Sequence, residues 1–218
     1  LPALLSAHQS IGLPQPIMQY GTDKQKERFL PQVARGAITA FALTEDDVGS
    51  DPSKLRTRAK PIEGGKRYLL NGEKLWCTNG TLARFLVVMA RTPKVKRGGG
   101  KKGGAITAFV VDTRWPGVKV VNRCRFMGLR ALYNGVIRFN NVRVPAENVI
   151  LAPGKGMRVA LNALSVGRLT LPAACAGLVR ESLRITREWT TERRQWGCEI
   201  GKHEAIAAKV ADMAADAF

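Results

Sequence analysis

Two short runs of the sequence end an apolar stretch in hydroxyl, amide and glycine residues. Residues 41–51 read FALTEDDVGSD, and residues 76–80 read WCTNG, which places an indole beside small polar groups. A flat ring with a polar edge needs an apolar face to pack on and hydrogen-bonding groups at its rim. Together the runs predict a small-molecule site. Taken alone, the first run could instead be a turn whose hydroxyls satisfy its own backbone.

Arg168 is the cation whose position is most informative. Apolar residues recur at steps of three and four from Met157 to Trp189, which predicts one long helix that Pro172 bends without ending. Arg168 falls on this apolar stripe, where a buried cation without a partner is costly. Its partner is either a carboxylate of a neighbouring element or an anionic ligand, and position alone does not choose between them.

The charge balance favours anionic partners. The 218 residues include 35 Lys and Arg against 17 Asp and Glu, a formal net charge of +18. Nucleic acid, membrane headgroups and phosphorylated cofactors would all fit this balance. Residues 91–103 hold six cations and no acid, which indicates a solvated loop, with phosphate or membrane-surface contact as the alternative. No aromatic residues are interleaved there, so a single-stranded nucleic-acid platform is disfavoured.

Cysteine and histidine usage argues against a metal site. The four cysteines are far apart in sequence, and there are only two histidines. This pattern favours a reducing compartment and excludes a disulfide framework. No apolar run approaches the length of a membrane span. Because the chain starts at Leu1, targeting is not judged, and we expect a protein that is not secreted: cytoplasmic in a bacterium, or in the mitochondrial matrix of a eukaryote.

Three segments with different periodicity are expected to position these groups. Residues 1–37 read as helical, with a capping box at Thr22 and Gln25 and a helix end at Pro31. Residues 38–150 hold short apolar runs separated by turn pairs, which indicates an antiparallel β-barrel or sandwich. Residues 151–218 read as two helices. The predicted fold is α+β, with an antiparallel β-barrel middle domain between helical segments. The expected strand runs are 38–44, 68–71, 85–90, 105–111, 118–121, 136–139 and 142–144.

The order and spacing of the motifs over nearly the whole chain resemble the acyl-CoA dehydrogenases, most closely their long-chain or very-long-chain branch. The matching segments are residues 8–12, 20–31, 43–51, 71–80, 108–111, 127–128, 142–148, 167–168 and 193–197. The resemblance implies an internal piece of the family fold. Residues 1–37 would end the N-terminal helical domain, 38–150 would form the middle β-barrel, and 151–218 would begin the C-terminal helical bundle.

The resemblance also implies FAD between barrel and bundle. Thr44 and Thr78 would hydrogen-bond the flavin ring, and Trp76 would pack against it. Residues 193–196 match a segment that reaches the FAD of a neighbouring subunit, which implies a homodimer or homotetramer. The residues implied to bind FAD are Phe41, Leu43, Thr44, Gly49, Ser50, Trp76, Cys77, Thr78, Arg193, Arg194, Gln195 and Trp196. Those implied to bind the acyl-CoA are Ser50, Ser165 and Arg168.

The implied activity is the α,β-desaturation of a fatty acyl-CoA in β-oxidation, with an electron-transfer-flavoprotein-like acceptor. The family's usual catalytic Glu would lie beyond residue 218. A minority of the family carries the base just before the arginine, where this chain has Gly167. We therefore expect no catalytic residue in this chain. The alternatives are a non-catalytic flavin- or CoA-binding relative and an interaction module; a nucleic-acid-binding protein rests on charge alone.

Overall fold

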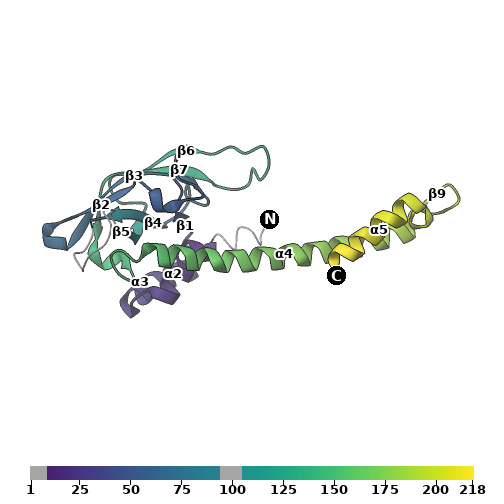
Figure 1. Ribbon diagram of the computed structural model, residues 1–218, viewed down its shortest axis with the longest axis horizontal. Helices are drawn as coiled ribbons and strands as arrows, with labels where there is room; N and C mark the ends of the chain where they lie inside the picture. The colour runs from purple at the N-terminus through teal and green to yellow at the C-terminus, as the bar shows by residue number, and fades with distance from the viewer. Residues whose placement is uncertain (1–8, 94–104) are drawn as a thin grey trace. The chain divides into compact units, whose positions relative to one another are not determined.

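A computed structural model describes residues 9–93 and 105–218 of the chain. The chain divides into two compact units, residues 1–167 and 168–218. The first unit holds the helices α2 and α3, a β-sheet and the start of the long helix α4 (Gly156–Glu192) (Figure 1). The second holds the rest of α4 and the elements that follow it. Most of the basic loop predicted at residues 91–103 lies outside the described residues.

Helices α2 (Pro14–Tyr20) and α3 (Asp23–Ala34) precede the first strand of the sheet. The predicted capping box is confirmed: Thr22 Oγ1 accepts from the Gln25 N–H at 3.3 Å, and Gln25 Oε1 accepts from the Thr22 N–H at 3.0 Å. The Gln25 amide also donates to the carbonyl of Val149 at 2.9 Å, which ties α3 to the sheet. The prediction that Pro31 ends the helix was wrong, because α3 continues to Ala34. A proline so near the end removes one N–H donor from a helix that is almost complete.

Eight strands form one sheet in the first unit. Their order is β6-β7-β3-β2-β4-β5-β8, with β1 paired to β4. The α+β class is confirmed, but the closed antiparallel barrel is not. Among the described residues β6 and β8 end the sheet, whereas a barrel would pair them. The pairs β1–β4 and β2–β4 are also parallel. The strands are β1 (Thr39–Ala42), β2 (Arg58–Ile62), β3 (Arg67–Cys77), β4 (Phe85–Thr92), β5 (Ala105–Asp112), β6 (Val118–Arg123), β7 (Gly135–Pro145) and β8 (Val149–Ile150).

Strand β4 is buried on both faces. Leu86 and Val88 face one apolar cluster, which contains residues of β1, β3, β5 and β7. Val87 and Met89 face a second cluster, which contains residues of α2, α3 and the start of α4. A strand covered on both sides reads as a continuous apolar run rather than an alternating one, as β4 does. The sheet therefore contributes to two apolar cores. One lies among its own strands, and the other lies between the sheet and the helices.

A glycine permits a close approach between β3 and the segment before β2. Gly72 has φ +144°, and a Cβ atom there would lie 2.7 Å from Thr57 Cα. We expect Gly72→Ala to lower the free energy of unfolding by roughly 2–3 kcal/mol, since the strained φ and the backbone clash add. Gly64→Ala is the matched control. Gly64 also has positive φ (+64°) but nothing lies within 4 Å, so only the conformational cost of about 1 kcal/mol should remain. Equal losses in urea unfolding would contradict the close approach.

The second unit contains most of α4 (Gly156–Glu192), a short hairpin and α5 (Glu204–Ala217). The helix continues through Pro172 as expected. The hairpin pairs β9 (Arg194–Gln195) with β10 (Cys198–Glu199). By length and composition alone α4 is long and apolar enough to cross a membrane, although it contains no continuous apolar run of that length. Core helices of soluble proteins meet the same criterion.

Candidate functional site

The structure brings the two polar-ended runs together. The Leu75 N–H donates to the Thr44 carbonyl at 2.9 Å, so the end of β3 runs beside the segment that follows β1. The Cys77 thiol lies 3.5 Å from the Phe41 carbonyl. Residues more than thirty positions apart thus form one continuous wall in the first unit.

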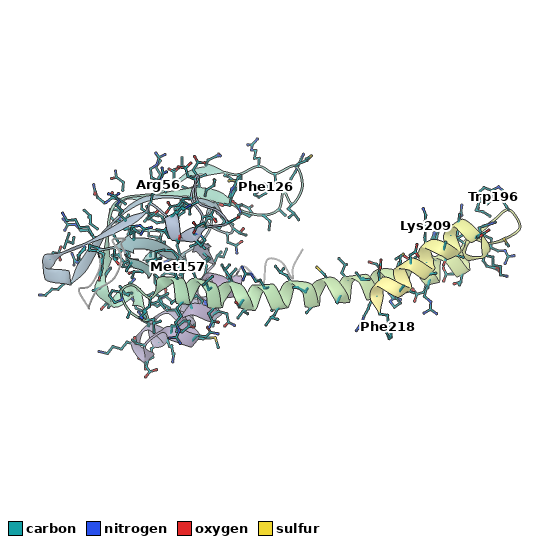
Figure 2. The ribbon with its side chains drawn as sticks, viewed as in Figure 1. Arg56, Phe126, Met157, Trp196, Lys209 and Phe218 are labelled. Atoms are coloured by element: carbon teal, nitrogen blue, oxygen red, sulfur yellow. The ribbon has the colours of Figure 1, made fainter. Side chains whose placement is uncertain are left out.

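Trp76 projects from this wall. It has φ +56°, a left-handed conformation that is unusual for a bulky residue. The register with β7 also shifts between Lys74 and Cys77, and such irregularities redirect side chains. The indole is 53% exposed and meets the Phe126 ring at a centroid distance of 5.7 Å. Figure 2 shows Phe126 near the loop that joins β6 to β7. Trp76 therefore offers an accessible aromatic face.

The Thr78 hydroxyl is oriented by a residue that the sequence analysis missed. The Asn134 side-chain amide donates to Thr78 Oγ1 at 2.9 Å, and Asn134 is only 5% exposed. The Thr78 O–H donates to no acceptor among the described residues, so it can donate to a group at the wall. Asn134 Oδ1 is buried and finds no hydrogen-bond partner among the described residues. In the sequence, Asn134 before Gly135 signals only a turn.

A buried ion pair lies directly behind the wall. Lys74 Nζ donates to Glu45 Oε1 at 2.7 Å and to the Leu43 carbonyl at 2.9 Å. The Glu45 carboxylate also accepts from the backbone N–H groups of Arg56 and Thr57. Burial lowers the pKa of Lys74 to about 8, against the opposing effect of Glu45. Burial raises the pKa of Glu45, but the charge of Lys74 and the hydrogen bonds to the carboxylate outweigh it, so the net shift is downward.

Cys77 faces the core, so only its backbone could reach a ligand on the wall. Its side chain is 1% exposed, and burial raises its pKa to about 12 from an ordinary value of 9.0. The pKa of the Cys77 thiol is therefore higher in the folded protein than in the unfolded chain. For this reason the contribution of the buried thiol to the free energy of unfolding is complete below pH 9 and is lost as pH rises toward 12.

We therefore expect alkaline destabilisation that depends on Cys77. Above pH 9 the wild type should lose up to about 1.4 kcal/mol per pH unit relative to Cys77→Ala. Urea unfolding at a series of pH values measures this difference. A difference that is constant from pH 8 to 10 would contradict the buried thiol. Cys175→Ala, at an exposed thiol, is the control for the loss of a thiol outside the core.

The loop after Thr44 places the other residues of the first run. Glu45 and Val48 exchange backbone hydrogen bonds of 3.1 and 3.0 Å across a tight turn. Gly49 and Ser50 follow this turn and are exposed, while Phe41 and Leu43 are partly buried and pack on the helix-side core. This exposure leaves Gly49 and Ser50 accessible to a ligand beside the wall.

Ser165 lies on α4 near the end of the first unit. It is exposed, and its hydroxyl donates to the Leu161 carbonyl at 2.8 Å. This bond stays within the helix, so the described contacts of Ser165 are local.

Arg168 belongs to the second unit, and the prediction that it is buried was wrong. It is exposed rather than buried on the apolar stripe. The stripe itself is largely open in the described residues, with Leu178 66% and Ile185 52% exposed. An arginine on an uncovered stripe needs no buried counter-charge, so the premise of a costly unpaired cation does not hold here.

The segment 193–196 forms the tip of the second unit. Arg193, Arg194 and Gln195 are exposed, and Trp196 is 87% exposed. Figure 2 shows Trp196 at the turn between α4 and α5. Arg194 pairs with Glu199 across the hairpin at 2.5 Å. Three of the four side chains thus have local partners: Arg194 pairs with Glu199, Gln195 donates to the Arg194 carbonyl at 2.6 Å, and the Trp196 ring meets the His203 ring at a centroid distance of 5.4 Å.

Comparison with protein families gives three consecutive matches along this chain. The acyl-CoA dehydrogenase N-terminal domain matches residues 1–37, the middle domain residues 40–142 and the C-terminal domain residues 154–217. Curated relatives show the same relationship. A probable acyl-CoA dehydrogenase FadE10 of Mycobacterium tuberculosis is 54% identical over 215 residues, covering 99% of this chain and 32% of that protein. The very long-chain specific acyl-CoA dehydrogenase of Rattus norvegicus mitochondria is 42% identical, covering 96% and 32%.

Solved structures agree with the sequence matches. Butyryl-CoA dehydrogenase from Megasphaera elsdenii superimposes with a TM-score of 0.87 at 33% identity, covering 98% of this chain and 55% of that one. An acyl-CoA dehydrogenase of Bacillus anthracis complexed with FAD gives 0.86 at 32% identity, covering 97% and 35%. The chain spans about a third of the length of the curated relatives that it matches.

Proposed function

The chain belongs to the acyl-CoA dehydrogenase family, and we propose that the protein containing it is an FAD-dependent enzyme that oxidises an acyl-CoA at its α and β carbons. The match of three successive family domains in the family's order carries this proposal. The wall formed by the two runs supports it independently, because the wall contains an exposed indole and hydroxyls at one edge.

The residues of the wall fit a flavin. Trp76 presents an accessible aromatic face, and Thr78 has a hydroxyl proton that no described residue accepts. Thr44 uses its carbonyl to accept from Leu75, while its N–H and hydroxyl donate to no described residue. An apolar face with donors at its rim is the environment that the ring requires. FAD, when bound, supplies the acceptor for the substrate hydride.

Each residue of this chain has a defined part in the proposed reaction. Trp76 packs against the ring and keeps water from it, and Thr44 and Thr78 hold its orientation by donating hydrogen bonds at its edge. Ser50, Ser165 and Arg168 are proposed to contact the acyl-CoA, and the exposed guanidinium of Arg168 suits an anionic ligand. Gly167 has no side chain to remove a proton, so we propose that the base for the α-proton lies outside this chain.

The finer assignments follow the relatives. The similarity to a very long-chain enzyme supports a long acyl chain as substrate. We propose an electron-transfer-flavoprotein-like acceptor and a homodimer or homotetramer, to which residues 193–196 contribute contacts with the FAD of a neighbouring subunit. The proposed compartment is the cytoplasm of a bacterium or the mitochondrial matrix of a eukaryote.

Anaerobic titration of the FAD-loaded full-length protein with acyl-CoAs of increasing chain length tests the proposal. We expect the visible flavin absorption to bleach, most completely with long chains, as the flavin is reduced. Bound flavin that no acyl-CoA reduces would instead indicate a non-catalytic flavin-binding relative. A protein that binds neither FAD nor acyl-CoA would indicate an interaction module and would overturn the proposal.

A further inference from the structure

Lys74 and Glu45 form the most deeply buried ion pair among the described residues. Their side chains are 0% and 8% exposed, whereas every other described pair has a partner at least 26% exposed. Apolar side chains of similar size usually stabilise a core at least as well as a buried ion pair. Stability alone is therefore a weak reason for placing two charges at this position.

The pair connects three separate segments. The Lys74 ammonium holds the Leu43 carbonyl, one residue before Thr44. The Glu45 carboxylate, one residue after Thr44, accepts from the backbone N–H groups of Arg56 and Thr57. Thr44 is thus fixed on both sides by one side-chain network.

Lys74 acts on the second run as well. It lies two residues before Trp76 on β3, and the Leu75 N–H between them bonds to the Thr44 carbonyl. With that carbonyl occupied, the remaining polar groups of Thr44 are its N–H and its hydroxyl. The network therefore joins the backbone on both sides of Thr44 to the strand that carries Trp76.

We propose that Lys74 and Glu45 are positioning residues, which hold the Thr44 donors and the Trp76 ring in register for a flavin before it binds. Neither side chain would touch the flavin, because both are buried behind the wall. The inference rests on the proposed function, because it assigns the polar-edged ligand of the wall as FAD. Preorganisation of this kind raises affinity by removing the cost of ordering the site during binding.

The test uses apoprotein of the full-length chain and FAD binding measured by the quenching of flavin fluorescence. The double variant Lys74→Met/Glu45→Gln removes both charges and leaves no unpaired one in the core. We expect its Kd for FAD to rise at least tenfold at a temperature well below its Tm, with a shift in the visible flavin spectrum. A purely structural pair would lower Tm and leave Kd and spectrum unchanged.

The neighbouring ion pair provides a matched control. Glu73 precedes Lys74 on β3, and it pairs with Arg138 at 2.6 Å on the exposed side of the sheet. Glu73→Gln/Arg138→Met also removes one acid and one base, with Glu73 on the same strand as Lys74, and should keep Kd within twofold of the wild type. A Lys74/Glu45 double variant that binds FAD as the control does would overturn this inference alone. A wild type that fails to bind FAD would overturn the proposed function with it.

Hydrogen exchange of the wild type tests the same inference without substitution. In the apoprotein the Arg56, Thr57 and Leu75 amides should already be protected, because the network exists before the ligand binds. Amides that exchange freely until FAD is added would show that the flavin orders the network. That result would overturn preorganisation even if the double variant failed to fold.

Discussion

Replacing Lys74 by Met is expected to lower the free energy of unfolding by about 3–5 kcal/mol, the usual cost of removing one partner from a buried ion pair. The methionine side chain fills similar space but leaves the Glu45 carboxylate without its counter-charge. Two backbone N–H donors remain to the carboxylate, from Arg56 and Thr57. These donors solvate the charge only in part, so protonated Glu45 becomes favoured and its pKa should rise.

Urea unfolding of the single and double variants measures this effect. Lys74→Met/Glu45→Gln should lose less stability than Lys74→Met, because it leaves no charge to solvate. Lys26→Met is the exposed control: Lys26 pairs with Asp23 at 3.4 Å in solvent, and its loss should cost below about 1 kcal/mol. In the wild type, the depressed pKa of Glu45 gives stabilisation that is present above pH 4.5 and lost as pH falls below it. A Lys74→Met variant as stable as Lys26→Met would show that Lys74 is not buried with Glu45.

Local signals explain which elements could be predicted. The capping box joins Thr22 to Gln25, only three positions further along the chain. The strands near residues 85 and 105 are signalled by continuous apolar runs. Strand β2 was missed because its sequence, RAKPI, alternates around a proline and two cations. Residues 136–139 and 142–144 form one strand, β7, because it runs through the polar pair Asn140 and Asn141, where its register with β3 shifts. Closure of the sheet depends on long-range pairing, which no local pattern specifies.

The site shows the same division. The types of residue in the two runs predicted a wall with an indole and hydroxyls, and the structure places those runs together. Lys74 and Asn134 were missed because a charged or amide residue is usually exposed. The sequence did contain one signal for Lys74. Leu70, Gly72 and Lys74 are every second residue of β3 and therefore share one face, and Leu70 is fully buried. The alternation of side chains along β3 therefore indicates that Lys74 points into the core, as Leu70 does. A buried lysine needs an acidic partner, and here that partner is Glu45.

For Arg168 the sequence pattern predicted burial, and the structure shows exposure. The apolar stripe of α4 was real as a sequence pattern, but periodicity states only which residues share a face. Whether that face is covered depends on other elements. In the described residues α5 lines a groove with the last turns of α4, from Leu183 to Thr191, and Arg168 lies outside those turns. Burial inferred from a stripe therefore requires a named element to cover it.

Truncation of Phe109 should be as costly as loss of the ion pair, for a different reason. Phe109 lies in the centre of β5, is fully buried, and packs its ring edge-on against Tyr68 at 5.0 Å. We expect Phe109→Ala to lower the free energy of unfolding by about 3–5 kcal/mol, because the cavity adds to the lost transfer free energy. Unlike the Lys74 variant, its loss should not depend on pH between 4 and 8, since the apolar cluster around Phe109 contains no Asp, Glu, His or Lys among the described residues.

Graded substitutions separate packing from other effects at this position. Phe109→Leu keeps most of the apolar volume and should cost roughly 1–2 kcal/mol, while Met127→Ala, at a side chain that is 96% exposed, should change stability by no more than about 0.5 kcal/mol. Urea unfolding at two pH values, with equal m-values for the three variants, makes the comparison. A Phe109→Ala loss no larger than that of Met127→Ala would place Phe109 outside the core. Because Phe109 shares its cluster with Ala42 and Cys77, which belong to the two runs, that result would also contradict the packing of the wall on this core.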